Sequence, residues 1–512
     1  MPRFVLPLLI IVCLFSCKNE LTAPPLTEHT ESLRNPGLKP FYHGVASGDP
    51  YPESVILWTR VTPETQLSSI PVGWEVSEKE DFSTIFRSGS FTTRPERDYT
   101  VKVEAKGLHP GTQYFYRFKA LGQTSMTGKT RSAANDAEQL RFAFVSCSNY
   151  EWGYFNAYAQ VAKEKDLSAV VHLGDYIYEY GPGGYGDTTI GRVHIPDHEI
   201  VSLQDYRDRY AQYRLDPDLR AAHARHPFIA IWDDHEITNN SYKNGAQNHQ
   251  PDEGDYETRK AIAKQVYYEW LPIRESEHHY RSFSFGKLAD LIMLDERLAG
   301  RTQQADSLTD PRLNAPDQAL LGSEQMGWFA KQLSAGKGQW KLIGNQVIYS
   351  YLNWGYSSFS INLDSWDGYP AEQQQVADLI QTNAIENVIF LTGDTHRSWA
   401  FEATNQPKEY ASGKGAFAVE FGVTSINSGN ADERFPADSV IAHENKIVNS
   451  SINPHLKYCN MRDHGYVLLS IDGEKAVADF RFVGHPNRKS DQVGTGKSFV
   501  VKTGETVLTE NE

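Results

Sequence analysis

Four short apolar segments, each ending in residues that can bind a metal ion, constrain this chain more than any other feature. Residues 169–173 are apolar and β-branched, as is typical of a strand buried on both faces of a sheet. This run stops at Gly174, and Asp175 and Tyr178 follow it closely. Ligands of open α/β sheets bind beyond the carboxyl ends of the strands, so a site is predicted at this position.

The other three segments end in the same way. Residues 140–147, 228–236 and 387–396 are apolar runs that end in VSC, WDDHE and GDTH. Burying so many ionisable groups side by side is costly unless a cation or hydrogen bonds compensate them. A surface loop can explain one such ending, but four together predict a single metal centre. Its candidate residues from these three segments are Cys147, Asp233, Asp234, His235, Glu236, Asp394 and His396.

The motifs also carry a family resemblance. GDYIY at residues 174–178 resembles the GDxxY motif of purple acid phosphatases, and WDDHE and GDTH are similar to the GNHE and GHxH motifs of metallophosphoesterases. With Cys147, Asp234 and Asp394 in this pattern, the ordered set resembles the PhoD-type alkaline phosphatase family. The resemblance covers the chain from about His43 to its end. It implies an α/β (α+β) metallophosphoesterase-like sandwich of two mixed sheets flanked by helices.

The resemblance implies two metal positions. The first receives a thiolate, a carboxylate, a phenolate and an imidazole, from Cys147, Asp175, Tyr178 and His396. Such a set suits trivalent iron. The second receives only oxygen ligands, with Asp175 as a bridge beside Asp234 and Asp394, and suits calcium or magnesium. The family points to Fe(3+) and Ca(2+), while ligand softness alone leaves manganese or zinc open.

Two adjacent cations clamp a phosphate and lower the pKa of a bound water, which predicts direct attack of metal-bound hydroxide without a phosphoenzyme. His235 stands where the GNHE histidine orients the substrate or protonates the leaving group, although a purely supporting hydrogen bond is the alternative. Asp233 and Glu236 are expected to hold the ligands in place.

Three further side chains are candidates for substrate contacts. Arg297, in LDERLAG, is expected to grip phosphate oxygens in a bidentate way, although the family usually has a threonine where Glu296 stands. Asn239 and Asn345 are candidate polar contacts at the same rim.

The predicted function is an exported, metal-dependent hydrolase of phosphate monoesters with some activity on diesters. A phosphodiesterase or phospholipase with the same metal centre is one alternative, and a non-catalytic binding lipoprotein of the cell surface is another. The net charge of −15 argues against nucleic acid as a partner but does not exclude phosphorylated substrates. The expected substrates are small phosphate esters, and the enzyme is expected to be a monomer.

The amino end predicts export. Residues 1–17 contain one early arginine and an apolar stretch that is too short to span a bilayer, as in a signal peptide. The letters LFSC at residues 14–17 resemble the bacterial lipobox, which implies that Cys17 is acylated and anchors the protein to a membrane in the periplasm or on the cell surface. An ordinary cleaved signal is the alternative. Residues 18–40 are polar and proline-rich, which predicts a flexible tether.

A length of 512 residues favours two domains after the tether. Residues 41–131 contain short strand-like runs separated by turn signals, which predict an all-β domain of the fibronectin or immunoglobulin type. Strand and helix patterns alternate over residues 138–505, the predicted catalytic domain.

Cysteine usage leaves one alternative open. Cys13 is removed with the signal peptide and Cys17 is the expected anchor, so Cys147 and Cys459 remain. Two cysteines in an exported protein are candidates for a disulfide. If they are paired, Cys147 cannot supply a thiolate to iron.

Overall fold

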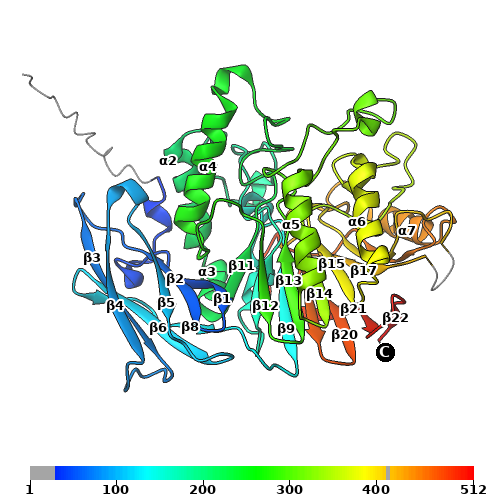
Figure 1. The fold of residues 1–512 in the computed structure, drawn as a ribbon. Helices are drawn as coiled ribbons and strands as arrows, with labels where there is room; N and C mark the ends of the chain where they lie inside the picture. The colour runs from blue at the N-terminus through cyan, green and yellow to red at the C-terminus, as the bar shows by residue number, and fades with distance from the viewer. Residues whose placement is uncertain (1–28, 411–414, 512) are drawn as a thin grey trace, which may run out of the picture.

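A ten-stranded mixed sheet forms the centre of the molecule in the computed structural model, which describes residues 29–410 and 415–511 (Figure 1). The parallel strands β9, β10 and β11 lie in its middle. The strands in spatial order are β22 (Thr509–Glu510), β21 (Val493–Lys502), β20 (Lys475–Val483), β19 (Gly465–Ile471), β9 (Leu140–Val145), β10 (Ala169–His172), β11 (Pro227–Ala230), β1 (Val45–Tyr51), β2 (Ser54–Arg60) and β5 (Thr100–Lys106).

A seven-stranded mixed sheet packs against the first one. Its strands in spatial order are β12 (Arg281–Phe285), β13 (Ala289–Met293), β14 (Trp340–Asn345), β15 (Val388–Thr392), β17 (Ala418–Gly422), β16 (Ser398–Ala403) and β18 (Leu456–Asn460). One apolar cluster joins the facing sides of the two sheets, with Phe144 and Val171 from the first and Leu342 and Leu391 from the second. Two mixed sheets with a shared core were expected from the sequence, and the structure has them.

Helices cover the outer faces of both sheets. The helices α1 (Asn156–Val161), α2 (Leu203–Leu215), α3 (Pro217–Arg225) and α4 (Tyr256–Trp270) share an apolar cluster with Val145 and Val170. The helices α5 (Gly322–Ala335) and α6 (Pro370–Thr382) pack in the same way on Ile343 and Phe390 of the second sheet. Helix α7 (Ala437–Val448) packs against β18. Strand residues therefore alternate between the inner core and the helices, as the pleat requires.

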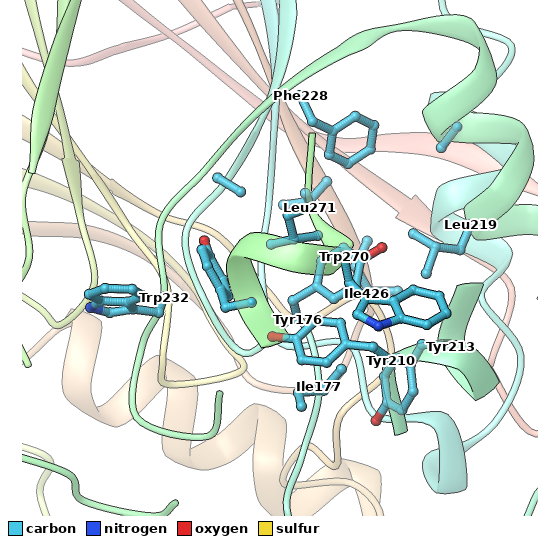
Figure 2. Close-up of a cluster of buried hydrophobic side chains, with 14 of the residues drawn as sticks. Tyr176, Ile177, Tyr210, Tyr213, Leu219, Phe228, Trp232, Trp270, Leu271 and Ile426 are labelled. Atoms are coloured by element: carbon cyan, nitrogen blue, oxygen red, sulfur yellow. The ribbon is translucent and has the colours of Figure 1, made fainter. Parts of the chain in front are cut away.

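Figure 2 shows how the helix-side core fixes the segment that follows β10. Tyr176 and Ile177 lie among side chains of α2, α3 and the end of α4, and Tyr176 stacks on Tyr210 at a ring distance of 6.0 Å. The Tyr176 hydroxyl also lies 2.8 Å from Nε2 of His223. Because Tyr176 is held on the helix side, its neighbours Asp175 and Tyr178 are fixed at the end of the strand.

The N-terminal strands form a third sheet that faces β1, β2 and β5 across a core of its own, which includes Val45, Leu57 and Phe118. The members of this sheet are β3 (Ile70–Ser77), β4 (Arg87–Thr93), β6 (Gln113–Ala120), β7 (Gln123–Thr124) and β8 (Gly128–Arg131). In Figure 1 these strands stand at the left of the molecule. Strand β1 pairs in parallel with β11, so one sheet of the predicted separate sandwich is continuous with the central sheet.

The predicted tether ends earlier than residue 40. Residues Glu31–Leu33 and Pro36–Leu38 form two short 3-10 turns, Thr30 is buried, and Nδ1 of His29 lies 2.7 Å from Oδ2 of Asp208 on α2. The prediction is therefore wrong for residues 29–40, because these contacts hold the segment against the folded domain. The predicted signal peptide, Cys17 and residues 18–28 lie outside the described residues. Within residues 29–410 and 415–511, every helix is too short or too polar to cross a membrane.

Candidate metal centre

The strand ends predicted to carry metal ligands meet at one edge of the two sheets. The backbone N–H of Cys147 donates to the carbonyl of Gly174 at 3.1 Å, which ties the end of β9 to the end of β10. Four predicted ligands have a left-handed backbone, with φ of 58° at Cys147, 57° at Asp175, 63° at Asp394 and 61° at His396. This conformation is strained in residues other than glycine, and such strain concentrates at functional sites.

The four residues predicted for the first metal position lie together. The Tyr178 hydroxyl is 3.0 Å from Oδ2 of Asp175 and 3.0 Å from Nε2 of His396. The ligand atoms of Cys147, Asp175 and His396 all lie within 4.8 Å of one another. One ion can therefore reach the sulfur, the carboxylate, the phenol and the imidazole.

The second position differs in one member from the predicted set. Ligand atoms of Asp175, Asp234 and His235 lie within 4.8 Å of one another, so Asp175 belongs to both groups, as a bridging ligand must. Asp394 is not part of this close group. Its Oδ1 lies 3.4 Å from Nη2 of Arg297, which is itself 3.9 Å from Oδ1 of Asp234. Arg297 therefore stands beside the two carboxylates that were predicted to share the second ion.

Unsatisfied carboxylate oxygens at the centre fit metal binding. Oδ1 of Asp175, Oδ1 of Asp234 and Oδ2 of Asp233 are buried and have no hydrogen-bond partner among the described residues. Burial, and after it the charges of neighbouring carboxylates, raise the pKa of Asp394 well above its ordinary value. Burial also raises the pKa of Asp175. Cations placed between these oxygens would satisfy them and remove the cost of holding several carboxylates together.

Hydrogen bonds orient the imidazole of His396. The carbonyl of Gly429 lies 2.9 Å from Nδ1 of His396. A carbonyl only accepts, so Nδ1 carries the proton and the lone pair of Nε2 faces Tyr178 and the first metal position. Burial lowers the pKa of His396 to about 3, which keeps the ring neutral and able to bind a metal. The hydroxyls of Tyr185, 3.2 Å from Nδ1, and of Ser428, 2.8 Å from the Tyr178 oxygen, complete the surroundings.

His235 forms a pair with a glutamate that the sequence reasoning missed. Its Nδ1 lies 2.6 Å from Oε2 of Glu179, and its ring centre is 4.3 Å from that of Tyr178. Burial lowers the pKa of His235, but the charges of Glu179, Asp234 and Asp175 outweigh it and hold the pKa well above its ordinary value. Glu179 directly follows Tyr178 in the GDYIYE motif, and this adjacency was the signal that could have revealed it.

Glu236 holds the backbone beneath the ligands. Its carboxylate accepts hydrogen bonds from the N–H groups of Asp175 at 3.1 Å, Tyr176 at 2.7 Å and Asp233 at 2.9 Å. Glu236 therefore has the supporting role that the sequence predicted, because it fixes the turn after β10 against the turn after β11.

Arg297 does not have the predicted role. Its side chain is fully buried, its Nε donates to Oδ1 of Asp233, and its two terminal nitrogens donate to Asp364 at 2.9 Å each. The prediction that this guanidinium grips phosphate oxygens is wrong, since carboxylates already occupy its bidentate face. Asp364 lies far from the motifs in the sequence and no pattern marked it.

The structure contradicts the predicted substrate contact for one of the two asparagines and leaves it open for the other. Asn345 is fully buried, and its amide donates to Thr392 at 3.1 Å and accepts from Nε1 of Trp366 at 3.0 Å. The prediction of a substrate contact at Asn345 is wrong, because its side chain points into the core. Asn239 is partly exposed and its amide donates to Gln247 at 2.7 Å, so its role in substrate binding stays a prediction.

The two remaining cysteines are both buried and free. The alternative of a disulfide between Cys147 and Cys459 is therefore wrong, and the sulfur of Cys147 is available to a metal.

Comparisons with known proteins agree with this geometry. The family model described as PhoD-like phosphatase matches residues 142–480, and the one described as PhoD-like phosphatase, N-terminal domain, matches residues 28–134. The chain is 39% identical over 503 residues to alkaline phosphatase D of Bacillus subtilis (strain 168), which covers 92% of this chain and 82% of that protein. A solved structure titled "Structure of PhoD" superposes with a TM-score of 0.84 at 36% identity and covers 93% of both chains.

Proposed function

The chain belongs to the PhoD-like phosphatase family and is a phosphoric ester hydrolase, and from this premise we propose an exported, lipid-anchored enzyme that hydrolyses phosphate monoesters and, more slowly, diesters. One observation carries the catalytic part of the proposal: two groups of ligand atoms share Asp175 at the edge where the strands end. Adjacent cations bridged by a carboxylate are the arrangement used to hydrolyse phosphate esters. The facing mixed sheets support a metallophosphoesterase-like fold. We also propose that the N-terminal sandwich is of the fibronectin or immunoglobulin type.

The donor sets support unlike ions at the two positions. Thiolate, phenolate and imidazole suit Fe(3+) at the first position, whose ligands are Cys147, Asp175, Tyr178 and His396. Carboxylates suit Ca(2+) at the second position, where Asp175 and Asp234 lie close together. We propose Asp394 as the third ligand, which requires its carboxylate to turn from Arg297 toward the ion. Manganese or zinc would also fit the donor chemistry. When bound, the ions supply positive charge that acidifies water and stabilises the phosphate oxygens in the transition state.

Side chains of the protein supply the proton and hold the acidic residues in position. Nδ1 of His235 is engaged by Glu179, so Nε2 is the atom that can hold a proton for the leaving oxygen of the substrate. Arg297 positions Asp233 and Asp364 without touching the substrate. We propose direct attack by water on phosphorus: the new P–O bond forms as the bond to the alcohol breaks, the alcohol leaves with the proton of His235, and the proton released by the water restores His235.

A turnover assay combined with metal analysis tests the proposal. Purified protein supplied with iron and calcium should release p-nitrophenol from p-nitrophenyl phosphate, and Asp175→Asn should abolish release while exchange of exposed Asp491 for asparagine leaves it intact. Ferric iron bound to phenolate or thiolate absorbs visible light, so Tyr178→Phe and Cys147→Ser should each change the visible spectrum. A wild-type protein that is inactive with every metal would contradict the proposal.

The alternatives predict other results in the same assay. A phosphodiesterase hydrolyses bis-p-nitrophenyl phosphate faster than p-nitrophenyl phosphate, and a phospholipase prefers phospholipid to both. A binding lipoprotein with a structural metal centre binds its ions fully and shows no turnover on any of the three substrates.

Export and anchoring are proposed from residues 1–17, with Cys17 as the acylated residue. Labelled palmitate should be incorporated into the wild type and into Cys13→Ala but not into Cys17→Ala. Loss of Cys17 should also move the protein from the membrane fraction to the soluble fraction. Unchanged membrane association of Cys17→Ala would contradict the anchor.

A further inference from the structure

Arg397 directly follows the metal ligand His396, and it has few partners. Its Nη1 donates to the carbonyl of Thr395 at 2.7 Å, and its Nε is buried with no hydrogen-bond partner. Across the part of the chain that the structure describes, no carboxylate forms an ion pair with it, whereas Arg297 nearby is bound by several. A partly buried cation that lacks a counter-ion is costly, so an anion bound at Arg397 would lower that cost.

The Arg397 side chain packs on residues 351–361, the aromatic loop. Its guanidinium carbon is 5.3 Å from the ring centre of Trp354, which is buried and packs edge-on against Trp399 at 5.3 Å. Arg397 directly follows His396, whose Nε2 lies 3.0 Å from the Tyr178 hydroxyl at the first metal position. Tyr185 stacks on the His396 ring at 6.2 Å. Arg397 is therefore fixed by Trp354 at the side of the metal centre, and it keeps partial exposure.

A second unpaired cation borders the same place. Arg434 is exposed and has no carboxylate partner within residues 29–410 and 415–511. It lies in the turn that follows Gly429, whose carbonyl is 2.9 Å from Nδ1 of His396, and its N–H donates to the carbonyl of Ala431 at 3.1 Å. Two side chains of the aromatic loop, Tyr356 and Phe359, are 41% and 44% exposed. In a chain with a net charge of −15, two unpaired arginines next to a metal centre mark a local preference for anions.

We propose that Arg397, assisted by Arg434, binds a negatively charged group on the alcohol part of the phosphate ester, a carboxylate or a second phosphate. This inference rests on the proposed function and deepens it, since it names the class of ester that the centre prefers. The metal centre takes the phosphate that reacts, and the two arginines take the charge that the leaving alcohol carries. Charge-assisted hydrogen bonds from a guanidinium are among the strongest that a protein offers to either anion.

Binding of ligands that cannot be hydrolysed separates this inference from the proposed function. Isothermal titration calorimetry on the metal-loaded protein would compare benzylphosphonate with 4-carboxybenzylphosphonate and with p-xylylenebisphosphonate. The wild type should bind the two doubly charged ligands roughly ten-fold more tightly, which corresponds to about one charge-assisted contact. The relative affinity of the carboxylate and the second phosphonate tells which anion the arginines prefer.

Arginine variants test the assignment. Arg397→Gln should remove most of the preference for the doubly charged ligands, Arg397→Lys should keep part of it, and Arg434→Gln should weaken it. Exposed Arg488, far along the chain, provides the matched control Arg488→Gln. Metal content of each variant shows whether the centre is still loaded.

Rates give an independent measurement. For 4-carboxyphenyl phosphate relative to phenyl phosphate, Arg397→Gln should lower the ratio of kcat/KM values roughly ten-fold, with the change mainly in KM. Equal losses on both esters would overturn the inference, because Arg397 would then bind the reacting phosphate. A preference that survives in both Arg397→Gln and Arg434→Gln would overturn it as well. A wild type that turns over neither ester contradicts the proposed function, while the phosphonate titration still decides the inference.

Discussion

Both terminal nitrogens of Arg297 donate to the two carboxylate oxygens of Asp364, each at 2.9 Å. The same guanidinium binds Asp233 through Nε and approaches Asp394 at 3.4 Å. The neighbouring charges raise the pKa of Arg297 against the effect of its burial. Arg297 is thus the positive centre that allows three acidic side chains to share one buried region.

Replacing Arg297 by methionine should therefore destabilise the fold strongly. The exchange leaves Asp233 buried without a cation and leaves Asp364 with Arg301 as its cation partner, which costs about 3–5 kcal/mol of unfolding free energy. Urea unfolding followed by circular dichroism measures the change. The matched control is Arg312→Met, which breaks surface pairs with Asp306 and Asp310 and should lower the unfolding free energy much less, because water screens exposed pairs. Equal costs for both exchanges would contradict the role of Arg297.

Gly174→Ala should disrupt the metal centre. Gly174 has φ of 110°, and a Cβ there would meet the backbone nitrogen of Asp233 at 2.6 Å and its Cβ at 2.4 Å. Neither atom is the end of a flexible side chain, so β10 and β11 must move apart. Gly191→Ala is the matched control, because Gly191 has φ of 79° but open space around its Cβ. Gly174→Ala should lower the free energy of unfolding by about 3 kcal/mol more than Gly191→Ala does, and it should reduce the metal content of the protein. Equal losses for the two exchanges would show that a small shift of the backbone relieves the contact.

The sequence predicted which site residues directly follow strands. It did not predict contacts that depend on packing between distant segments. Asp175 and Asp394 could be placed because an apolar run followed by glycine and aspartate is a local signal. The carboxylate partner of Arg297 could not, since Asp364 follows 67 residues later in a loop without a motif. Asn345 was misplaced for a related reason: it ends a buried strand, but strand position does not tell on which side its amide finds partners.

In the N-terminal region, the sequence predicted the strands but not how this region joins the rest of the fold. Turn signals and alternating residues revealed its short strands, because those features are local. The pairing of Ser47 in β1 with Pro227 in β11 joins segments 180 residues apart, and only the complete fold brings them together. The carboxyl end of the tether was misjudged in the same way, since the contact of His29 with Asp208 is invisible in a polar, proline-rich stretch.

Glu179→Gln should change the pH dependence of turnover. The charge of Glu179 helps to hold the pKa of His235 above its ordinary value, so its loss lowers that pKa and His235 loses its proton at a lower pH. If protonated His235 serves the leaving group, the alkaline limb of the kcat profile should move down by about one pH unit or more. The profile of p-nitrophenyl phosphate hydrolysis from neutral to alkaline pH measures the shift.

The control for Glu179 is Glu199→Gln. Glu199 accepts from Asn248 at 3.2 Å, as Glu179 does at 3.0 Å, but it does not contact His235. Its exchange should leave the alkaline limb in place. An unmoved limb in Glu179→Gln would show that this pair does not set the proton affinity of the catalytic imidazole.

His172 makes the fold sensitive to acid. It is fully buried at the end of β10, where Nδ1 accepts from the N–H of Gly174 at 3.2 Å and Nε2 lies 2.8 Å from the Tyr158 hydroxyl. Burial lowers its pKa to about 3, against about 6.5 in the unfolded chain. The folded state therefore binds fewer protons, so this contribution to stability is complete above pH 6.5 and is lost as the pH falls toward 3.

His172→Gln should accordingly reduce the acid sensitivity. Glutamine can accept from Gly174 and donate to Tyr158 but does not titrate, so the drop in unfolding free energy between pH 7 and pH 5 should shrink by about 2 kcal/mol. Urea unfolding of both proteins at the two pH values measures the difference. His485→Gln, at an exposed histidine, should keep the wild-type drop, because water surrounds that side chain before and after unfolding. Since loss of metal ligands in acid affects all three proteins alike, an unchanged drop in His172→Gln would mean that His172 is protonated in the native protein at pH 5.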